Sequence, residues 1–414
     1  MLSEKDREIL RALASKQMEL HKSPENLSLI KEWYRHNSCI KGRPIIHMDI
    51  THMSNDVIIP LLKCCSPDAR KIEFDLYKCC LNFELFGDDW PVPGYFPVLY
   101  GSWINFFGFD TTGEKYGDSI AMIHPVRINN LEAEADSLGE TVMGIDRENA
   151  RRIFDVSQDV FGDILPPKFG HDVPRVVPTR ELVYILGMEK LCYSLYDCPD
   201  KVHQIMERIT DGYYKFFDFL SGEGLIFPTT SFEMVRQSSL AFNLELPDEN
   251  VMKSRPLTSH DIWGYMDSQE SVSISPEMFS EFFMPYYKKL SELFAFLSYG
   301  CCEPVSKNWD ICLHKFENLR KVSISAWCDE EYMGERLAGK KIIFQRKLPT
   351  EYLSQEGPLD EEGIRKCLCK TLNAAKGCQL EITQMDVYSL KGDYEKIRRY
   401  VELIRHTIEE RYCQ

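Results

Sequence analysis

The sequence predicts an α/β protein built as one closed (β/α)8 barrel, with parallel strands inside and helices outside. Strand-like and helix-like segments alternate at intervals of roughly 20 to 40 residues, the rhythm of parallel βα units. This rhythm continues from residue 44 to residue 414, and no linker rich in Gly, Ser or Pro divides it. A doubly wound sheet would need a Gly-rich phosphate loop after its first strand, and the sequence has none there. One barrel over residues 44–414 is therefore favoured over two domains.

Residues 1–43 are predicted to form a helical extension before the barrel. Leu10, Leu13, Leu20 and Leu27 supply an intermittent apolar face, and Ser23-Pro24 indicates a break. The first residues are charged, and no apolar signal region follows them. A cytoplasmic location is therefore expected.

The predicted strands are apolar or β-branched runs that end at polar residues or at Gly and Pro. They span residues 45–50, 224–228, 296–299, 320–329, 341–349 and 378–387. The predicted helices have apolar residues at helical spacing. They span residues 68–86, 131–161, 199–219, 275–295, 330–337, 360–376 and 393–411. The aromatic segment 91–110 is expected either to wall a substrate pocket or to pack as cover for the barrel.

Charge and cysteine content exclude several classes of protein. A net charge of -15 argues against a nucleic-acid-binding surface, although a local basic pocket stays open. No apolar run approaches the roughly 20 residues that span a bilayer, so no membrane segment is expected. The fifteen cysteines include the adjacent pairs Cys64-Cys65, Cys79-Cys80 and Cys301-Cys302. Such pairs do not suit a secreted disulfide framework, and reduced thiols are expected.

Potential metal ligands follow the strand-like run 296–299. Gly300, Cys301, Cys302 and Glu303 come directly after it, at the end of the strand where barrel enzymes keep their chemistry. Two sulfurs and a carboxylate form a mixed donor set that suits zinc. The alternative is that both cysteines are small buried hydrophobes. Adjacent residues of a strand point to opposite faces, so both sulfurs bind one ion only if Gly300 bends the backbone.

Other polar side chains are expected at the same end of the barrel. His47, Trp327, Arg346 and Asp386 lie near the ends of predicted strands and would face a common bowl with Cys301. For His47, together with Asp49 and His52, the sequence leaves open a ligand, a substrate contact, or a side chain satisfied by the backbone.

Several motifs together resemble the uroporphyrinogen-decarboxylase-like methyltransferases, in particular the branch associated with corrinoid-dependent demethylation. The motifs are Asp261-Ile262-Trp263-Gly264, Ser268-Gln269-Glu270, Ser275-Pro276-Glu277-Met278-Phe279, Tyr299-Gly300-Cys301-Cys302-Glu303-Pro304, Asn318 to Trp327, and Gln345-Arg346-Lys347. Decarboxylation itself is not expected, because the N-terminal arginine-rich motif of the true decarboxylases is replaced by Pro44 to Asp49. The bowl also offers few obvious cations for a substrate with eight carboxylates.

The resemblance implies a zinc-dependent methyltransferase. It would move a methyl group from a methylated substrate, expected to be a methoxylated aromatic compound, to the cobalt of a cobalamin (corrinoid) carried by a partner protein. Cys301 falls at the position of the family's first cysteine ligand, and Cys378 is the natural candidate for the second. Tyr299 replaces the family's histidine, so Cys302, Glu303 or Glu270 would complete the ligand set.

A Lewis acid on the substrate heteroatom would assist release of a basic leaving group. Asp386 or Glu270 would supply its proton, with an ordinary hydrogen bond to a loop as the alternative for each carboxylate. Trp263, Trp327 and Tyr299 would sandwich an aromatic ring or belong to the core. Arg346 and Lys347 would hold a substrate carboxylate or pair with acids of the barrel, with Arg346 favoured for the substrate.

Two other functions stay open. The first is methyl transfer in the opposite direction, from methylcobalamin to a thiol. The second is a binding barrel without metal or catalysis. The sequence also leaves the oligomeric state open, a homodimer included.

Overall fold

The computed structural model describes residues 2–115 and 122–412. Its centre is a six-stranded parallel sheet with the order β1-β12-β11-β10-β9-β8. These strands are β1 (Ile45–Met48), β12 (Gln379–Gln384), β11 (Ile343–Lys347), β10 (Leu319–Ile324), β9 (Phe296–Tyr299) and β8 (Trp263–Met266). Two further strands, β2 (Phe96–Leu99) and β7 (Pro167–Gly170), pair with each other, also in parallel.

The predicted α/β class with parallel strands is confirmed. A closed ring of hydrogen-bonded strands is not seen within residues 2–115 and 122–412. No ladder there joins β1 to β2, and an isolated bridge between Arg175 and Tyr265 links the segment after β7 to β8.

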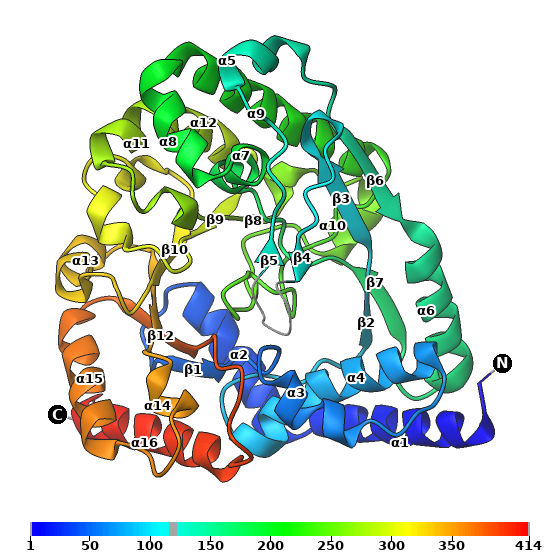
Figure 1. The fold of residues 1–414 in the computed structure, drawn as a ribbon. Coiled ribbons are helices and arrows are strands. Elements are labelled where there is room, and N and C mark those ends of the chain that lie inside the picture. The colour runs from blue at the N-terminus through cyan, green and yellow to red at the C-terminus, as the bar shows by residue number, and fades with distance from the viewer. Residues whose placement is uncertain (1, 116–121, 413–414) are drawn as a thin grey trace.

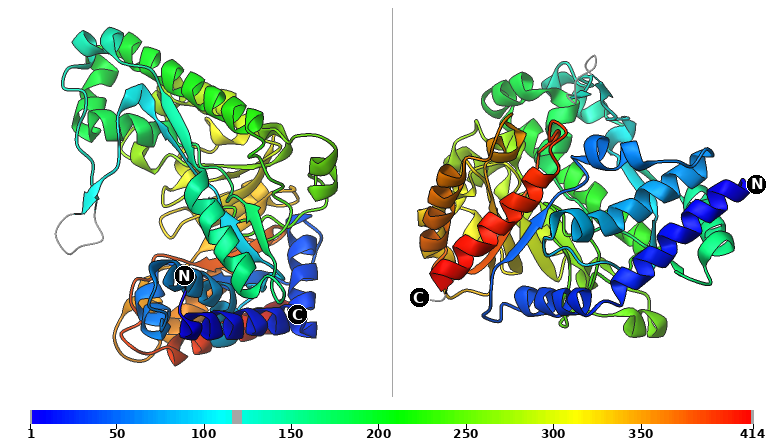
Figure 2. Two further views of the ribbon diagram at one scale, coloured as in Figure 1. Left: turned by 90° about the vertical axis from the view of Figure 1, so that its right-hand side faces the viewer. Right: turned by 90° about the horizontal axis from the view of Figure 1, so that it is seen from below.

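Helices lie around the outside of the strands (Figure 1). Seen from below in Figure 2, α1, α4 and α16 cover the lower side of the molecule. The helices are α1 (Glu4–His21), α2 (Pro24–Asn37), α3 (Ser54–Val57), α4 (Pro67–Leu81), α5 (Leu131–Glu134), α6 (Arg147–Phe161), α7 (Pro178–Leu186), α8 (Met188–Asp197), α9 (Pro199–Gly222), α10 (Glu249–Ser254), α11 (Pro276–Phe282), α12 (Met284–Ser291), α13 (Glu330–Leu337), α14 (Glu351–Ser354), α15 (Glu361–Ala374) and α16 (Glu395–Tyr412). None of the helices in the described ranges is both long and apolar enough to cross a membrane.

The predicted helical extension 1–43 contains α1 and α2, with Ser3 and Ser23 as their N-caps. Each serine hydroxyl accepts a hydrogen bond from a backbone N–H of the first turn, which satisfies a donor that has no partner within the helix. Helix α1 packs on α4 and α6, and α2 contacts β1. The extension is therefore tied to the rest of the chain.

Several sequence predictions of elements are wrong. Residues 224–228 form no strand, and the predicted helix 131–161 is interrupted by β6 (Val142–Asp146), which pairs with β3 (Gly101–Asn105). Strands β2, β7 and β8 were not predicted. Each has only four residues, and Pro97 and Pro167 weaken the strand signal of the first two.

The side of the sheet facing away from the helices carries a buried polar network around Glu381 of β12. Its carboxylate accepts hydrogen bonds from Lys321 Nζ at 2.6 Å and from Gln345 Nε2 at 3.0 Å. It also lies 2.9 Å from His47 Nε2 and 3.2 Å from His36 Nε2. Burial opposes ionisation of Glu381, but Lys321 and the two histidines outweigh it and hold its pKa well below the usual value. The network joins β1, β10, β11, β12 and α2.

Replacing one charge of this network is expected to destabilise the fold. In Lys321→Met, the Glu381 carboxylate loses its cationic partner and stays buried. We therefore expect the free energy of unfolding to fall by about 3–5 kcal/mol. Arg151→Met, at an exposed pair with Asp155, is the matched control and is expected to change stability by less than ~0.5 kcal/mol. Chemical denaturation of both variants measures the difference. Equal stability of the two would contradict this role of Lys321.

Candidate functional site

Gly300 turns the chain at the carboxyl end of β9 and brings two sulfurs together. Its φ is +101°, and an added Cβ would approach Val305 Cγ1 to 3.0 Å. L-residues rarely adopt this conformation, so the turn favours glycine. Beyond it, the Sγ atoms of Cys301 and Cys302 lie 3.7 Å apart. The sequence analysis required Gly300 to bend the backbone if both sulfurs were to bind one ion, and the structure shows this bend.

Glu303 holds this turn from behind. Its carboxylate accepts hydrogen bonds from the backbone N–H of Ser268 at 2.9 Å and of Cys301 at 2.8 Å. Burial, followed by the nearby charge of Asp267, raises the pKa of Glu303 to about 7. Both carboxylate oxygens are thus engaged by the backbone. The prediction that Glu303 is a metal ligand is corrected: in this structure the side chain braces the loop.

Lys347, the last residue of β11, lies beside the thiol pair. Its Nζ is 3.6 Å from Cys302 Sγ and donates a hydrogen bond to Gln237 Oε1 at 2.9 Å. A hydrogen bond from Cys301 and the charge of Lys347 lower the pKa of Cys302 to about 6, although burial opposes this. Donation of that same hydrogen bond, together with burial, raises the pKa of Cys301. The pair thus holds one thiolate, on Cys302, at neutral pH.

Asp386 and His52 lie on the far side of Lys347. Asp386 Oδ2 is 3.8 Å from Lys347 Nζ, and Asp386 Oδ1 is 3.7 Å from His52 Nδ1. His52 Nδ1 is also 3.1 Å from Asp49 Oδ2. The hydrogen bond to Asp49 raises the pKa of His52, so the ring carries a proton more readily than a free histidine. The structure therefore brings the predicted residue Asp386 next to the thiols, with a cationic side chain on either side.

Glu270 lies in a separate acidic pair after β8. Burial and the charge of Asp267 raise its pKa. Its Oε2 atom is buried and has no hydrogen-bond partner within the described residues, and the same holds for Asp267 Oδ1. The other oxygen of Asp267 accepts from Arg175 Nη2 at 3.0 Å. The charges of Asp267 and Arg175 both act on Glu270, and no hydrogen bond between Glu270 and the thiols is seen among the described residues.

A cavity of about 300 Å³ opens where β1, β2 and β7 end. Its walls combine apolar and aromatic side chains with polar and charged ones, among them Lys71, Lys78, Lys168 and Glu233. The lining includes Asp49, Trp90, Pro91, Tyr95, Phe169, Phe232, Ser238 and Leu240. Asp49 belongs to this wall and also bonds to His52, so the cavity borders the polar site. Segment 91–110 was expected either to wall a pocket or to pack as cover for the barrel. Its residues up to Leu99 contribute to the wall of this cavity.

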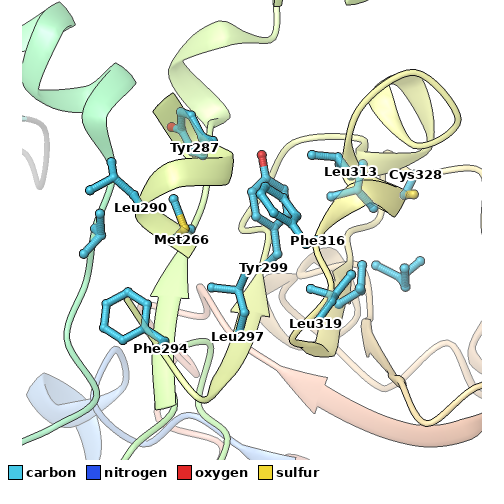
Figure 3. Close-up of a cluster of buried hydrophobic side chains, with 14 of the residues drawn as sticks. Met266, Tyr287, Leu290, Phe294, Leu297, Tyr299, Leu313, Phe316, Leu319 and Cys328 are labelled. Atoms are coloured by element: carbon cyan, nitrogen blue, oxygen red, sulfur yellow. The ribbon is translucent and has the colours of Figure 1, made fainter. Parts of the chain in front are cut away.

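Three predicted substrate contacts are buried away from the cavity. His47 bonds to Glu381 inside the sheet and is fully buried. Tyr299 packs in the core beside Phe316 and Leu297 (Figure 3), and its hydroxyl bonds to Ser268 Oγ at 2.7 Å. Trp263 is the first residue of β8, so it lies at the opposite edge of the sheet, packed on Phe296. These three predictions are corrected, because each side chain is enclosed by protein.

Arg346 is also structural. It contacts Glu330 Oε2 at 3.0 Å and donates to the carbonyl of Ser325 at 2.6 Å, on the helix side of β11. Its neighbour Lys347 points to the site instead, as the alternation of a strand requires. Trp327 does lie just beyond the carboxyl end of β10, but it is 80% exposed and encloses nothing.

Cys378 does not join the thiol pair. It precedes β12, whereas Cys301 follows β9, and the two strands are parallel members of one sheet. Cys378 therefore lies at the amino ends of the strands and Cys301 at their carboxyl ends, separated by about the length of a strand. The Sγ of Cys378 contacts the carbonyl of Gly334 instead. The predicted pairing of Cys378 with Cys301 is thus corrected.

Sequence reasoning missed Gln237 and Arg175 as parts of the site. It named Lys347 together with Arg346 as a cation of the bowl, and the structure places Lys347 beside the thiols, because the alternation along β11 sends the two side chains to opposite faces. Gln237 and Arg175 lie outside the named strands, and no periodic pattern marks them.

The thiol pair fits a zinc ion only in part. Two thiolates on one tetrahedral zinc, with Zn–S distances of about 2.3 Å, lie roughly 3.8 Å apart. The 3.7 Å between Cys301 Sγ and Cys302 Sγ matches that separation. Glu303 and Cys378 do not complete the set, and the described residues contain no group of three or more His, Cys, Asp and Glu side chains arranged for a metal ion. The chain thus offers two sulfur ligands.

The lowered pKa of Cys302 predicts fast alkylation of metal-stripped protein. With a pKa of about 6, about 90% of the thiol is ionised at pH 7, against ~3% for an ordinary cysteine. Reaction with iodoacetamide, followed by mass spectrometry from pH 5 to 9, should rise through pH 6 and then level off. Exposed Cys65 is the internal reference. Lys347→Met should shift the profile to higher pH, and an unchanged profile would contradict the role of Lys347.

Comparison of the chain with protein-family models gave no match. Comparison with curated proteins gave none either. The methyltransferase resemblance of the motifs around residues 261–347 therefore stays a prediction.

Proposed function

We propose that this protein is a methyltransferase that demethylates a small methylated substrate at the mouth beside Cys301 and Cys302. One observation carries the proposal: a vicinal thiol pair, activated by Lys347, stands at the carboxyl end of a parallel sheet. The carboxyl ends of parallel strands are the usual place of chemistry in α/β enzymes. An aromatic-lined cavity borders the same site through Asp49.

We further propose that the fold is a (β/α)8 barrel. The eight parallel strands are the six of the central sheet and the pair β2 and β7. Two contacts support closure. Tyr265 N donates to the carbonyl of Pro174 at 3.0 Å, beside β8, and Asp89 N donates to the carbonyl of Ile46 at 2.8 Å, beside β1. In such a barrel the cavity and the thiols open on one face.

Cys301 and Cys302 would hold a zinc ion as two of its ligands. When bound, zinc would supply a Lewis acid that withdraws electrons from the substrate heteroatom and makes the leaving group less basic. Among the described groups near the thiols, Lys347, Asp386 and His52 would contribute charge and protons. Glu303 and Gly300 fix the positions of the two sulfurs.

The cavity would bind the body of the substrate. Trp90, Tyr95, Phe169 and Phe232 give it aromatic walls, which suit a flat apolar ring. Asp49 lies in the cavity wall, at the side of the polar site. A methoxy group directed toward His52 would then leave the apolar part of the ring in the cavity.

Proton supply to the leaving oxygen falls to His52 in this proposal. The ring is held by Asp49, which favours its protonated form, and Asp386 lies 3.7 Å away. As the bond from oxygen to the methyl carbon breaks, the oxygen gains negative charge and takes this proton. The methyl acceptor, as the resemblance implies, is the cobalt of a corrinoid carried by a partner protein.

One observation favours a second candidate, a binding barrel without metal. Within the residues that the structure describes, two sulfur ligands come together, and Lys347 places a positive charge beside one of them. In that case a methoxylated aromatic compound would still bind in the cavity, but no methyl transfer would follow.

Metal analysis and a methyl-transfer assay test the proposal. Purified wild-type protein is expected to hold about one zinc per chain, while Cys301→Ser and Cys302→Ser should lose most of it, because each removes one of two thiolates. Methyl transfer from a methoxybenzoate to free cob(I)alamin should fall by at least ~100-fold in both variants. Cys378→Ser is the matched control and should retain metal and activity.

Full zinc content in both site variants would remove the thiols from the ligand set. Metal-free wild-type protein that binds the methoxybenzoate without demethylating it would favour the binding barrel. Methyl transfer from methylcobalamin to thiols, with none from the methoxybenzoate, would show that the reaction runs in the opposite direction.

A further inference from the structure

Three consecutive non-glycine residues have left-handed backbone conformations. The φ angles are +43° at Arg236, +47° at Gln237 and +53° at Ser238. Each such residue costs on the order of 1–3 kcal/mol, and such strain persists where the surroundings fix it, often at ligand sites. The turn is closed by the backbone bonds from Val235 N to the carbonyl of Ser239 at 2.8 Å and from Ser239 N to the carbonyl of Arg236 at 3.0 Å.

Gln237 fixes the middle of the turn from three sides. Its Nε2 donates to Tyr265 Oη at 2.8 Å, and its Oε1 accepts from Lys347 Nζ at 2.9 Å. Its backbone carbonyl accepts from Gln345 Nε2 at 2.8 Å. Ser238, the next residue, lines the cavity. The turn therefore lies between the cavity and the lysine of the thiol site.

Arg236 has hydrogen-bonding groups without a partner among the described residues. Its Nε donates to the carbonyl of Val173 at 3.2 Å. Within the described part of the chain, its two terminal nitrogens have no hydrogen-bond partner and no carboxylate within 4.0 Å, and they are not sealed from solvent. The guanidinium fork is therefore open to an incoming anion.

The charges around Arg236 have both signs. Burial lowers the pKa of Arg236, and so do the nearby charges of Arg175 and Arg180, while Asp172 acts in the opposite direction. Arg175 and Arg180 are themselves occupied, by Asp267 at 3.0 Å and by Glu181 at 2.5 Å. Arg236 is thus a cation beside two other cations whose own partners are already in place.

We propose that Arg236 binds the carboxylate of a small organic acid that is the substrate of this site. A guanidinium fork matches the two oxygens of a carboxylate. The sequence predicted this role for Arg346, but in the structure Arg346 forms an ion pair with Glu330. The inference deepens the proposed function, since it names an acid as the methylated substrate, but binding alone tests it and no methyl transfer is needed.

Binding of 4-methoxybenzoate and of its neutral analogue 4-methoxybenzamide to the full chain provides the test. The two compounds have nearly the same shape, and Trp90 in the cavity wall supplies a fluorescence signal. Wild-type protein is expected to bind the acid roughly tenfold or more tightly than the amide, because the charge-assisted pair is formed only with the acid. Arg236→Gln should abolish this preference and leave the affinity for the amide within about twofold.

Two further variants give controls. Arg236→Lys keeps the charge but not the fork, so it should retain only part of the preference. Arg151→Gln, on the exposed side of α6, should bind both compounds as wild type does. Unchanged amide binding shows that the Gln variant is folded; if it does not fold, the wild-type preference and the Lys variant decide.

Two results would overturn the proposal. One is equal affinity of wild-type protein for the acid and the amide. The other is a preference for the acid that survives Arg236→Gln. Inorganic phosphate distinguishes a general anion site from a substrate site: displacement of the acid by low-millimolar phosphate would also overturn it. Failure of methyl transfer with intact acid preference would count against the proposed reaction only.

Discussion

The left-handed turn at Gly300 is the constraint on which the candidate site depends. Neighbouring residues of a strand point to opposite faces, so two adjacent cysteines at a regular strand end would share no ligand. With φ at +101°, the chain leaves the strand, and the two sulfurs come within 3.7 Å of each other. Glu303 then fixes the turn through the backbone N–H groups of Ser268 and Cys301. The carboxylate therefore acts on the position of the thiols.

The sequence allowed the fold class to be predicted because its signals are local. Apolar runs such as 343–347 and helical spacing such as 361–374 depend on residues close in the chain, and the structure has these elements. Strands β2 and β7 were missed for the opposite reason. They are short, contain Pro97 and Pro167, and are stabilised by pairing with each other rather than by a pattern of their own.

The candidate site was predicted less completely. A residue joins the site only if it lies at the carboxyl end of a strand and on the correct face of the sheet. Cys378 and Cys301 look equivalent as cysteines near strands, but one precedes its strand and the other follows it. In a parallel sheet that difference places them at opposite edges. Arg346 and Lys347 are neighbours, but the alternation of the strand points their side chains to opposite faces. Arg346 therefore contacts Glu330, and Lys347 contacts Cys302. Asp386 follows a strand and its side chain lies near Lys347, as expected from the sequence, while its catalytic role stays a prediction.

Buried and half-buried charges divide into two groups that explain where function is expected. Around Glu381, each charged or polar neighbour has a partner within the protein, which suits a group whose role is to hold strands together. Around the mouth, the pKa of Cys302 is lowered, and the terminal nitrogens of Arg236 have no acceptor within residues 2–115 and 122–412. Groups in this second state lower stability unless a ligand satisfies them. The strained turn contacts Lys347 of the thiol site through Gln237 and, among the described residues, leaves the guanidinium of Arg236 without an acceptor, so it is better explained by binding than by folding.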